Sequence, residues 1–209
     1  IRDSDYQAWR EGLQQGRSFV TTGPMLLATA DGKAPGQVFQ FNSHDDEAAE
    51  VPIRIEVHSE SPLTFGEIIV NGKPEILIRP QNRKIESGAY RSVIEHRLQL
   101  HRSGWFAVRF WEDRPEGRIR FAHSAPWYVE LDGQPVKPSR EEKQYLISRM
   151  KDEIQRSRGV VSAEGLAEYE QALKFYRELP VLDDSHDVAR SARPVADETA
   201  RTRWLENMV

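Results

Sequence analysis

The stretch Gly16-Arg17-Ser18-Phe19-Val20-Thr21-Thr22-Gly23-Pro24-Met25-Leu26-Leu27 decides how this chain folds. Gly16 ends a helical pattern, and residues 18–21 suit a pleated strand. Gly23-Pro24 then turns the chain before an apolar run. The stretch therefore separates one helix from a long β-rich region.

The segment before this stretch has the pattern of an amphipathic helix. Tyr6, Trp9 and Leu13 recur at helical spacing, and Ser4 and Gln7 have the spacing of a capping box. This pattern predicts a helix over 5–15. Two aromatic rings on so short a helix are more apolar surface than the strands require. We expect the stripe to cover the end of the sheet or to pack on a partner outside this chain.

Composition limits the class of protein. The chain has 209 residues, of which 38% are apolar and 30% charged, as in a soluble globular protein of one domain with appendages or two small domains. No apolar run approaches the roughly 20 residues of a spanning helix. A net charge of -4 with intermixed signs predicts no nucleic-acid partner. The chain contains no cysteine, which excludes disulfides but leaves both a cytoplasmic and an exported location open.

Alternating apolar and polar residues predict many short strands after residue 24. Asp31-Gly32 is expected to turn one strand back on the next, and Asn71-Gly72 is the strongest hairpin signal in the sequence. The strand over 105–111 carries large side chains on both faces, so we expect it to be central and covered on both sides. The predicted strands are 25–30, 37–41, 53–57, 67–70, 75–78, 94–100, 105–111, 118–121 and 127–131.

The hydrophobic period changes from two to about 3.6 after Pro138. Ser139 and Ser162 are expected N-caps of two helices, which end near Gly159 and before Pro180. The sequence thus predicts a mainly β fold. It is an antiparallel β-sandwich of immunoglobulin-like size, with one N-terminal helix and a C-terminal helical pair.

The sequence contains no self-contained catalytic constellation. The acidic and histidine-containing segments 44–46 and 183–187 imitate metal sites but are interpreted as solvated surface. His96 and His101 fall on opposite phases of a strand and cannot share a metal without a bulge. His123 and Ser124 point to opposite faces, so they cannot act as base and nucleophile. We expect His123 to hold a bend by hydrogen bonding to backbone or to contact a ligand.

Several separate motifs, in order, resemble the C-terminal part of carbaryl-hydrolase-type PHP (polymerase and histidinol phosphatase) metallohydrolases, over about residues 5 to 180. They are Trp9, Gly12-Leu13, the stretch 16–24, Asp31-Gly32, Pro35-Gly36, Val70-Asn71-Gly72, residues 104–109, residues 122–129, and the ending Glu168-Tyr169-Glu170-Gln171-Ala172 with Phe175-Tyr176-Arg177.

This resemblance implies an upstream barrel-like hydrolase domain that holds divalent metals (Zn, Mn or Fe), whose ligands precede Ile1. No metal or cofactor is expected in this chain. Residues 1–24 would be the terminal helix and strand of the hydrolase domain, and 25–138 the sandwich. Residues 139–180 would form a helical hairpin on the sandwich or on the hydrolase domain, followed by a polar tail over 181–209. Because the chain begins with Ile1 and not Met, we expect its natural beginning to be missing.

Three functional hypotheses follow. The first is the accessory portion of a metal-dependent ester, amide or phosphoester hydrolase, inactive without its barrel, with Arg17, Thr21, Thr22 and His123 at the rim of the site. The second is a module in which Trp111 or Trp127 forms a platform for a carbohydrate or a protein. The third is a purely structural or dimerising domain, in which the terminal helices form the contact with a second copy.

Overall fold

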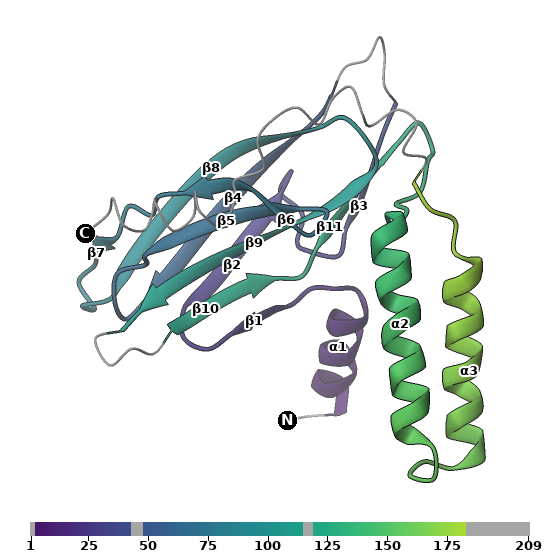
Figure 1. Cartoon of the computed structure of the whole chain (residues 1–209). Coiled ribbons are helices and arrows are strands. Elements are labelled where there is room, and N and C mark those ends of the chain that lie inside the picture. Colours follow the sequence, from purple (N-terminus) through teal and green to yellow (C-terminus); the bar gives the residue numbers. More distant parts are fainter. Residues whose placement is uncertain (1–2, 43–47, 115–118, 183–209) are drawn as a thin grey trace. The chain divides into compact units, whose positions relative to one another are not determined.

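The computed structural model describes residues 3–42, 48–114 and 119–182 (Figure 1). The chain divides into two compact units between Val136 and Lys137. The first unit contains one helix and all the described strands, and the second contains a pair of helices. The fold of the described residues is therefore mainly β with three helices, as predicted at that level.

The larger sheet has seven strands and is built around β9 (Gly104–Asp113). One edge of β9 pairs with β5 (Phe65–Val70), which forms a hairpin with β6 (Lys73–Ile78). Its other edge pairs with β10 (Ile119–Ser124) and β11 (Trp127–Leu131), which act as one strand interrupted at Ala125-Pro126. The predicted central strand and the predicted hairpin at Asn71-Gly72 are both confirmed.

Two outer strands of this sheet, on the side away from the β5–β6 hairpin, come from the start of the chain. β1 (Phe19–Thr21) pairs with β10, and β3 (Val38–Phe41) pairs with β11. The β3–β11 pair is parallel, so the prediction of a purely antiparallel fold is wrong. β1 lies within residues 1–24, the segment that the resemblance assigns to an upstream hydrolase domain. Its pairing with β10 nevertheless makes it part of this sheet.

The smaller sheet has four strands in the order β2 (Met25–Ala30), β4 (Ala49–Ser59), β8 (Tyr90–Leu100) and β7 (Arg83–Lys84). The predicted hairpin between 25–30 and 37–41 is wrong, because β2 and β3 belong to different sheets. The Asp31-Gly32 turn itself forms, closed by hydrogen bonds between Ala30 and Lys33. After that turn the chain crosses to the larger sheet, where it forms β3.

The two sheets share one hydrophobic core. Alternate residues of β4, including Ile53, Ile55 and Val57, face this core, while the residues between them face outward. From the larger sheet, β9 contributes Phe106, Val108 and Phe110, all fully buried. Period-two alternation therefore gives β4 one buried face, whereas β5 of the larger sheet is buried on both faces.

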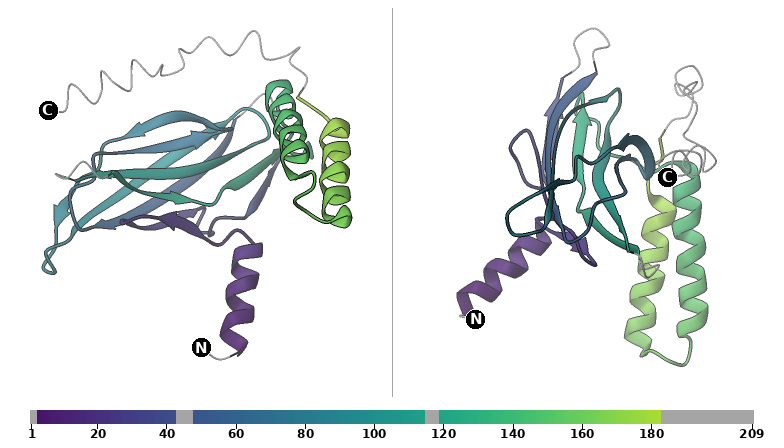
Figure 2. Two further views of the ribbon diagram at one scale, coloured as in Figure 1. Left: turned by 60° about the horizontal axis from the view of Figure 1, so that its bottom comes forward. Right: turned by 90° about the vertical axis from the view of Figure 1, so that its left-hand side faces the viewer.

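The N-terminal helix α1 (Asp3–Gln14) leads directly into β1, as two further views show (Figure 2). It begins before Ser4, so the predicted capping box of Ser4 and Gln7 is wrong. Gly16 adopts a positive φ of 71° and ends the helix, as predicted. The amide of Arg17 donates to the Gly12 carbonyl over 2.8 Å and closes the last turn.

The second unit is an α-helical hairpin of α2 (Arg140–Ser157) and α3 (Ala163–Glu178). Ser139 and Glu142 form the predicted capping box of α2, and Ser162 caps α3. Ile147 and Ile154 pack with Leu173 in a small core of their own. None of the described helices is both long and apolar enough to cross a membrane.

Candidate functional site

The predicted rim residues Arg17, Thr21 and Thr22 lie at the two ends of β1. Arg17 precedes the strand, at the end of α1, whereas Thr22 follows it. His123 lies on β10, directly opposite Val20. The structure therefore places these candidates along one strand pair and does not gather them into a single cluster.

The two threonines are engaged in local hydrogen bonds. The Thr21 hydroxyl donates to the Pro24 carbonyl over 2.6 Å and accepts from the Gly23 amide over 2.9 Å. The Thr22 hydroxyl accepts from the Phe121 amide over 3.0 Å, and the Thr22 amide donates to the Phe121 carbonyl. These contacts shape the turn out of β1 and extend its pairing with β10.

His123 contacts the backbone, which was one of the two roles predicted for it. Its Nδ1 lies 2.6 Å from the carbonyl oxygen of Ser124. The Ser124 hydroxyl is buried and accepts from the Val108 amide over 3.0 Å. The Ser124 side chain is thus part of the interior. His123 and Ser124 do not form a pair of base and nucleophile.

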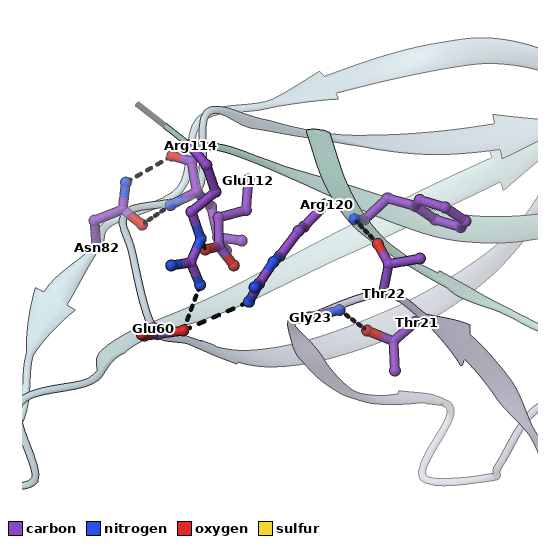
Figure 3. A network of polar contacts seen from close by, with 10 residues as sticks. Thr21, Thr22, Gly23, Glu60, Asn82, Glu112, Arg114 and Arg120 are labelled. Atoms are coloured by element: carbon purple, nitrogen blue, oxygen red, sulfur yellow. Dashed lines mark hydrogen bonds and ion pairs between the residues drawn. The ribbon is translucent and has the colours of Figure 1, made fainter. Parts of the chain in front are cut away.

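A cluster of four charged side chains lies beyond Thr22, where β9 ends and β10 begins (Figure 3). We call Glu60, Glu112, Arg114 and Arg120 the arginine cluster. The Glu112 side chain is fully buried, and its Oε1 lies 2.5 Å from Nε of Arg114. Nη2 of Arg114 reaches Oε2 of Glu60 over 2.5 Å, and Nη1 of Arg120 lies 3.5 Å from the same oxygen.

The cluster has one exposed member. The side chain of Glu60 is 74% exposed, whereas those of Arg114 and Arg120 are 12% and 31% exposed. The hydrogen bond from Arg114, with its charge, lowers the pKa of the Glu60 carboxyl. The same hydrogen bond raises the pKa of the Arg114 guanidinium. Both shifts favour the charged forms of Glu60 and Arg114 at neutral pH.

Sequence reasoning missed this cluster, although the sequence holds a signal for it. Glu112 continues the alternation of Phe106, Val108 and Phe110, so it falls on the core face of β9. A carboxylate on an apolar phase requires a cationic partner. Arg114, two residues later on the same phase, is that partner.

A second ion pair lies on the other face of the large sheet. Nη2 of Arg109 donates to Oε2 of the fully buried Glu67 over 2.5 Å. The Arg109 guanidinium also lies over the Trp111 ring, 4.9 Å from its centroid. Such stacking and pairing hold the arginine in one orientation.

The prediction that Trp127 forms part of a binding platform is wrong. Trp127 is fully buried, stacks on Phe106 at 5.3 Å between centroids, and donates from Nε1 to the Lys33 carbonyl. Trp111 is half-buried beside the rings of Phe65 and Phe121.

Among the described residues, no three His, Asp or Glu side chains are grouped so that they could hold a metal ion. The segments 44–46 and 183–187, which imitate metal sites in the sequence, lie outside the described residues.

The apolar stripe of α1 is exposed within the part of the chain that the structure describes. Tyr6 and Trp9 are each 59% exposed and stack at 5.9 Å between ring centroids, and Leu13 is 46% exposed. The stripe therefore does not cover the end of the sheet.

The backbone just after α1 passes close to Gly36. The Gly36 backbone contacts Gln15 and Gly16, and a Cβ added at Gly36 would lie 1.7 Å from the Gln15 carbonyl oxygen.

Comparison with known proteins identifies no family. No family model matches this chain, and no match is found among the curated proteins. The resemblance to PHP metallohydrolases accordingly stays a prediction.

Proposed function

We propose that this chain is the C-terminal accessory portion of a metal-dependent hydrolase, in which its two sheets form a β-sandwich of immunoglobulin-like size. The reaction would be the hydrolysis of an ester, amide or phosphoester, on divalent metals held by an upstream domain of the same protein. The chain's own contribution would be to bind and brace that domain. The shared core of the two sheets supports the sandwich.

The observation that carries the proposal is the exposed stripe of Tyr6, Trp9 and Leu13. A short helix gains most of its stability from burying its apolar face. Aromatic residues are also the commonest anchors of protein interfaces. The stripe on α1 therefore fits an apolar surface of a neighbouring domain.

The contact at Gly36 supports a bracing role. Because Gln15 and Gly16, directly after α1, pass close to Gly36, a domain bound to the stripe would be linked to the large sheet by a short, closely packed segment. Arg17, at the end of α1, is the rim candidate closest to the stripe in sequence. Thr21 and Thr22 would act at a distance, through the turn that they shape.

The test compares the 209-residue chain with a longer protein that restores the residues upstream of Ile1. We expect metal-dependent hydrolysis and bound Zn, Mn or Fe only in the longer protein. There, Trp9→Glu should lower both activity and melting temperature. Tyr145→Glu on α2, at an aromatic side chain that is 64% exposed, is the matched control and should change neither. A longer protein without bound metal, or an equal effect of both variants, would refute the proposal.

The competing occupant of the stripe is a second copy of this chain. Light scattering on the 209-residue chain distinguishes the two. A mass that rises with concentration and falls to the monomer value in Trp9→Glu would favour dimerisation over docking to an upstream domain.

A further inference from the structure

The two arginines of the arginine cluster each contact a group other than Glu60. Arg114 is fixed from behind by the buried Glu112 carboxylate, which engages its Nε and leaves Nη2 directed at Glu60. The stem of Arg120 lies close to Gly23, where an added Cβ would be 2.5 Å from the arginine Cδ. The two guanidinium groups converge on the Glu60 carboxylate, and each arginine also has a contact elsewhere in the chain.

The group at that point is the most exposed member of the cluster. Glu60 belongs to the segment that follows β4, and 74% of its side chain is in contact with solvent. An exposed carboxylate keeps most of its hydration, so its ion pairs contribute little stability. Replacing the Glu60 carboxylate by another anion should therefore require little free energy.

The charge balance favours such an exchange. Within the cluster, Arg114 and Arg120 face the single buried carboxylate of Glu112 once Glu60 is displaced. Among the described side chains of the cluster, two guanidinium groups then face a single carboxyl group at a partly desolvated position. Paired guanidinium groups recognise carboxylate and phosphate oxygens by charge-assisted hydrogen bonds.

We propose that Arg114 and Arg120 form an oxyanion-binding site for a carboxylate or phosphate group of a ligand, and that the Glu60 carboxylate occupies this site as an intramolecular substitute. The inference does not rest on the proposed function, because it concerns only residues of this chain. The proposed site lies beyond Thr22 (Figure 3).

The test uses the 209-residue chain and its Glu60→Ala variant, titrated with acetate or with inorganic phosphate. NMR signals of the Arg114 and Arg120 Nε–H groups and of the Phe121 amide report binding. Because an intramolecular carboxylate competes at an effective concentration of about millimolar or more, its removal should strengthen anion binding by roughly tenfold. Acetate binding would identify a carboxylate ligand, and phosphate binding a phosphate ester.

The matched control is Glu95→Ala. Glu95 is also exposed, to 73%, and pairs with Arg54 over 2.6 Å on the smaller sheet, so this variant makes the same change in net charge elsewhere. It should leave anion binding as weak as in the unmodified chain. Adding Arg120→Gln to Glu60→Ala should abolish the gain, and Arg120→Lys should restore part of it.

Two results would overturn the proposal. One is that Glu60→Ala binds neither anion in the millimolar range. The other is that Glu95→Ala gains as much affinity as Glu60→Ala, which would show a general effect of net charge. Circular dichroism of each variant confirms that the fold is retained.

Discussion

Thr22 and Phe121 are joined in both directions: the Thr22 amide donates to the Phe121 carbonyl over 2.9 Å, and the Phe121 amide donates to the Thr22 hydroxyl over 3.0 Å. The side chain of Thr22 thus replaces a backbone acceptor and extends the pairing of β1 with β10 beyond Thr21. A residue that sequence analysis placed at the rim of an active site has a clear structural role.

Thr22→Val should therefore destabilise the chain. The substitution keeps the shape and removes one hydrogen bond, which contributes about 1 kcal/mol to stability. Urea unfolding monitored by circular dichroism measures the change. Thr29→Val, at a half-buried threonine of β2, is the control and should cost less. Equal losses in the two variants would show that the bond to Phe121 is unimportant.

Truncation of Trp127 and of Trp9 should have different effects on the stability of the chain. Trp127 is fully buried and stacked on Phe106, so Trp127→Ala should cost about 3–5 kcal/mol of unfolding free energy. Trp9 is 59% exposed, so Trp9→Ala should change the stability of the 209-residue chain by less than about 0.5 kcal/mol. Chemical unfolding of both variants measures this. A large loss in Trp9→Ala would mean that α1 already buries its stripe within this chain.

The parts of the fold that depend on neighbouring residues in the sequence, such as turns and helix caps, were predictable. Asn71-Gly72 turns β5 into β6, and Ser139 with Glu142 starts α2, because turn and cap chemistry depends on neighbouring residues alone. Asp31-Gly32 also forms its turn, but β2 and β3 join different sheets. That pairing depends on which distant strand each buried face meets, a non-local property that turn residues do not encode.

The candidate site was less predictable for the same reason. Arg17 and Thr22 are neighbours in sequence, yet β1 lies between them and separates them along the sheet. Glu60 and Arg114 are distant in sequence, and only the folding of the two sheets brings them into contact. Glu112 alone gave a usable signal, as a charged residue on the apolar phase of β9.

Two glycines with similar backbone angles test how α1 is held. Gly32 and Gly36 have φ of 70° and 88°, so alanine at either position is strained by roughly 1–2 kcal/mol. At Gly32 a Cβ would meet nothing within 4 Å, whereas at Gly36 it would lie 1.7 Å from the Gln15 carbonyl oxygen.

Gly36→Ala should therefore reduce stability more than Gly32→Ala and should displace the segment Gln15-Gly16 that follows α1. Urea unfolding measures the first effect, and hydrogen exchange at the Arg17 amide measures the second. Faster exchange confined to Gly36→Ala is the expected result. The same exchange rate in both variants would contradict the close contact between α1 and Gly36.

Glu56 on the outer face of the smaller sheet makes the stability of the chain depend on pH. Nε of Arg91 donates to its Oε1 over 2.7 Å, and Nε2 of His58 lies 2.8 Å from the same oxygen. The hydrogen bond from Arg91, followed by that from His58, lowers the pKa of Glu56 from 4.5 to about 2. A carboxyl whose pKa is lowered in the folded chain stabilises the fold above its unfolded pKa, and this contribution is lost as the pH falls toward the folded value.

Glu56→Gln should therefore reduce stability at neutral pH, and its difference from the unmodified chain should shrink between pH 4.5 and about 2. Titration of the Glu56 carboxyl by NMR gives the midpoint directly. Arg91→Gln should raise that midpoint, because it removes the strongest interaction with the ionised form. Arg54→Gln, on the same face but paired with Glu95, should leave the midpoint almost unchanged. A midpoint near 4.5 in the unmodified chain, or equal shifts in the two arginine variants, would show that Arg91 does not control the ionisation of Glu56.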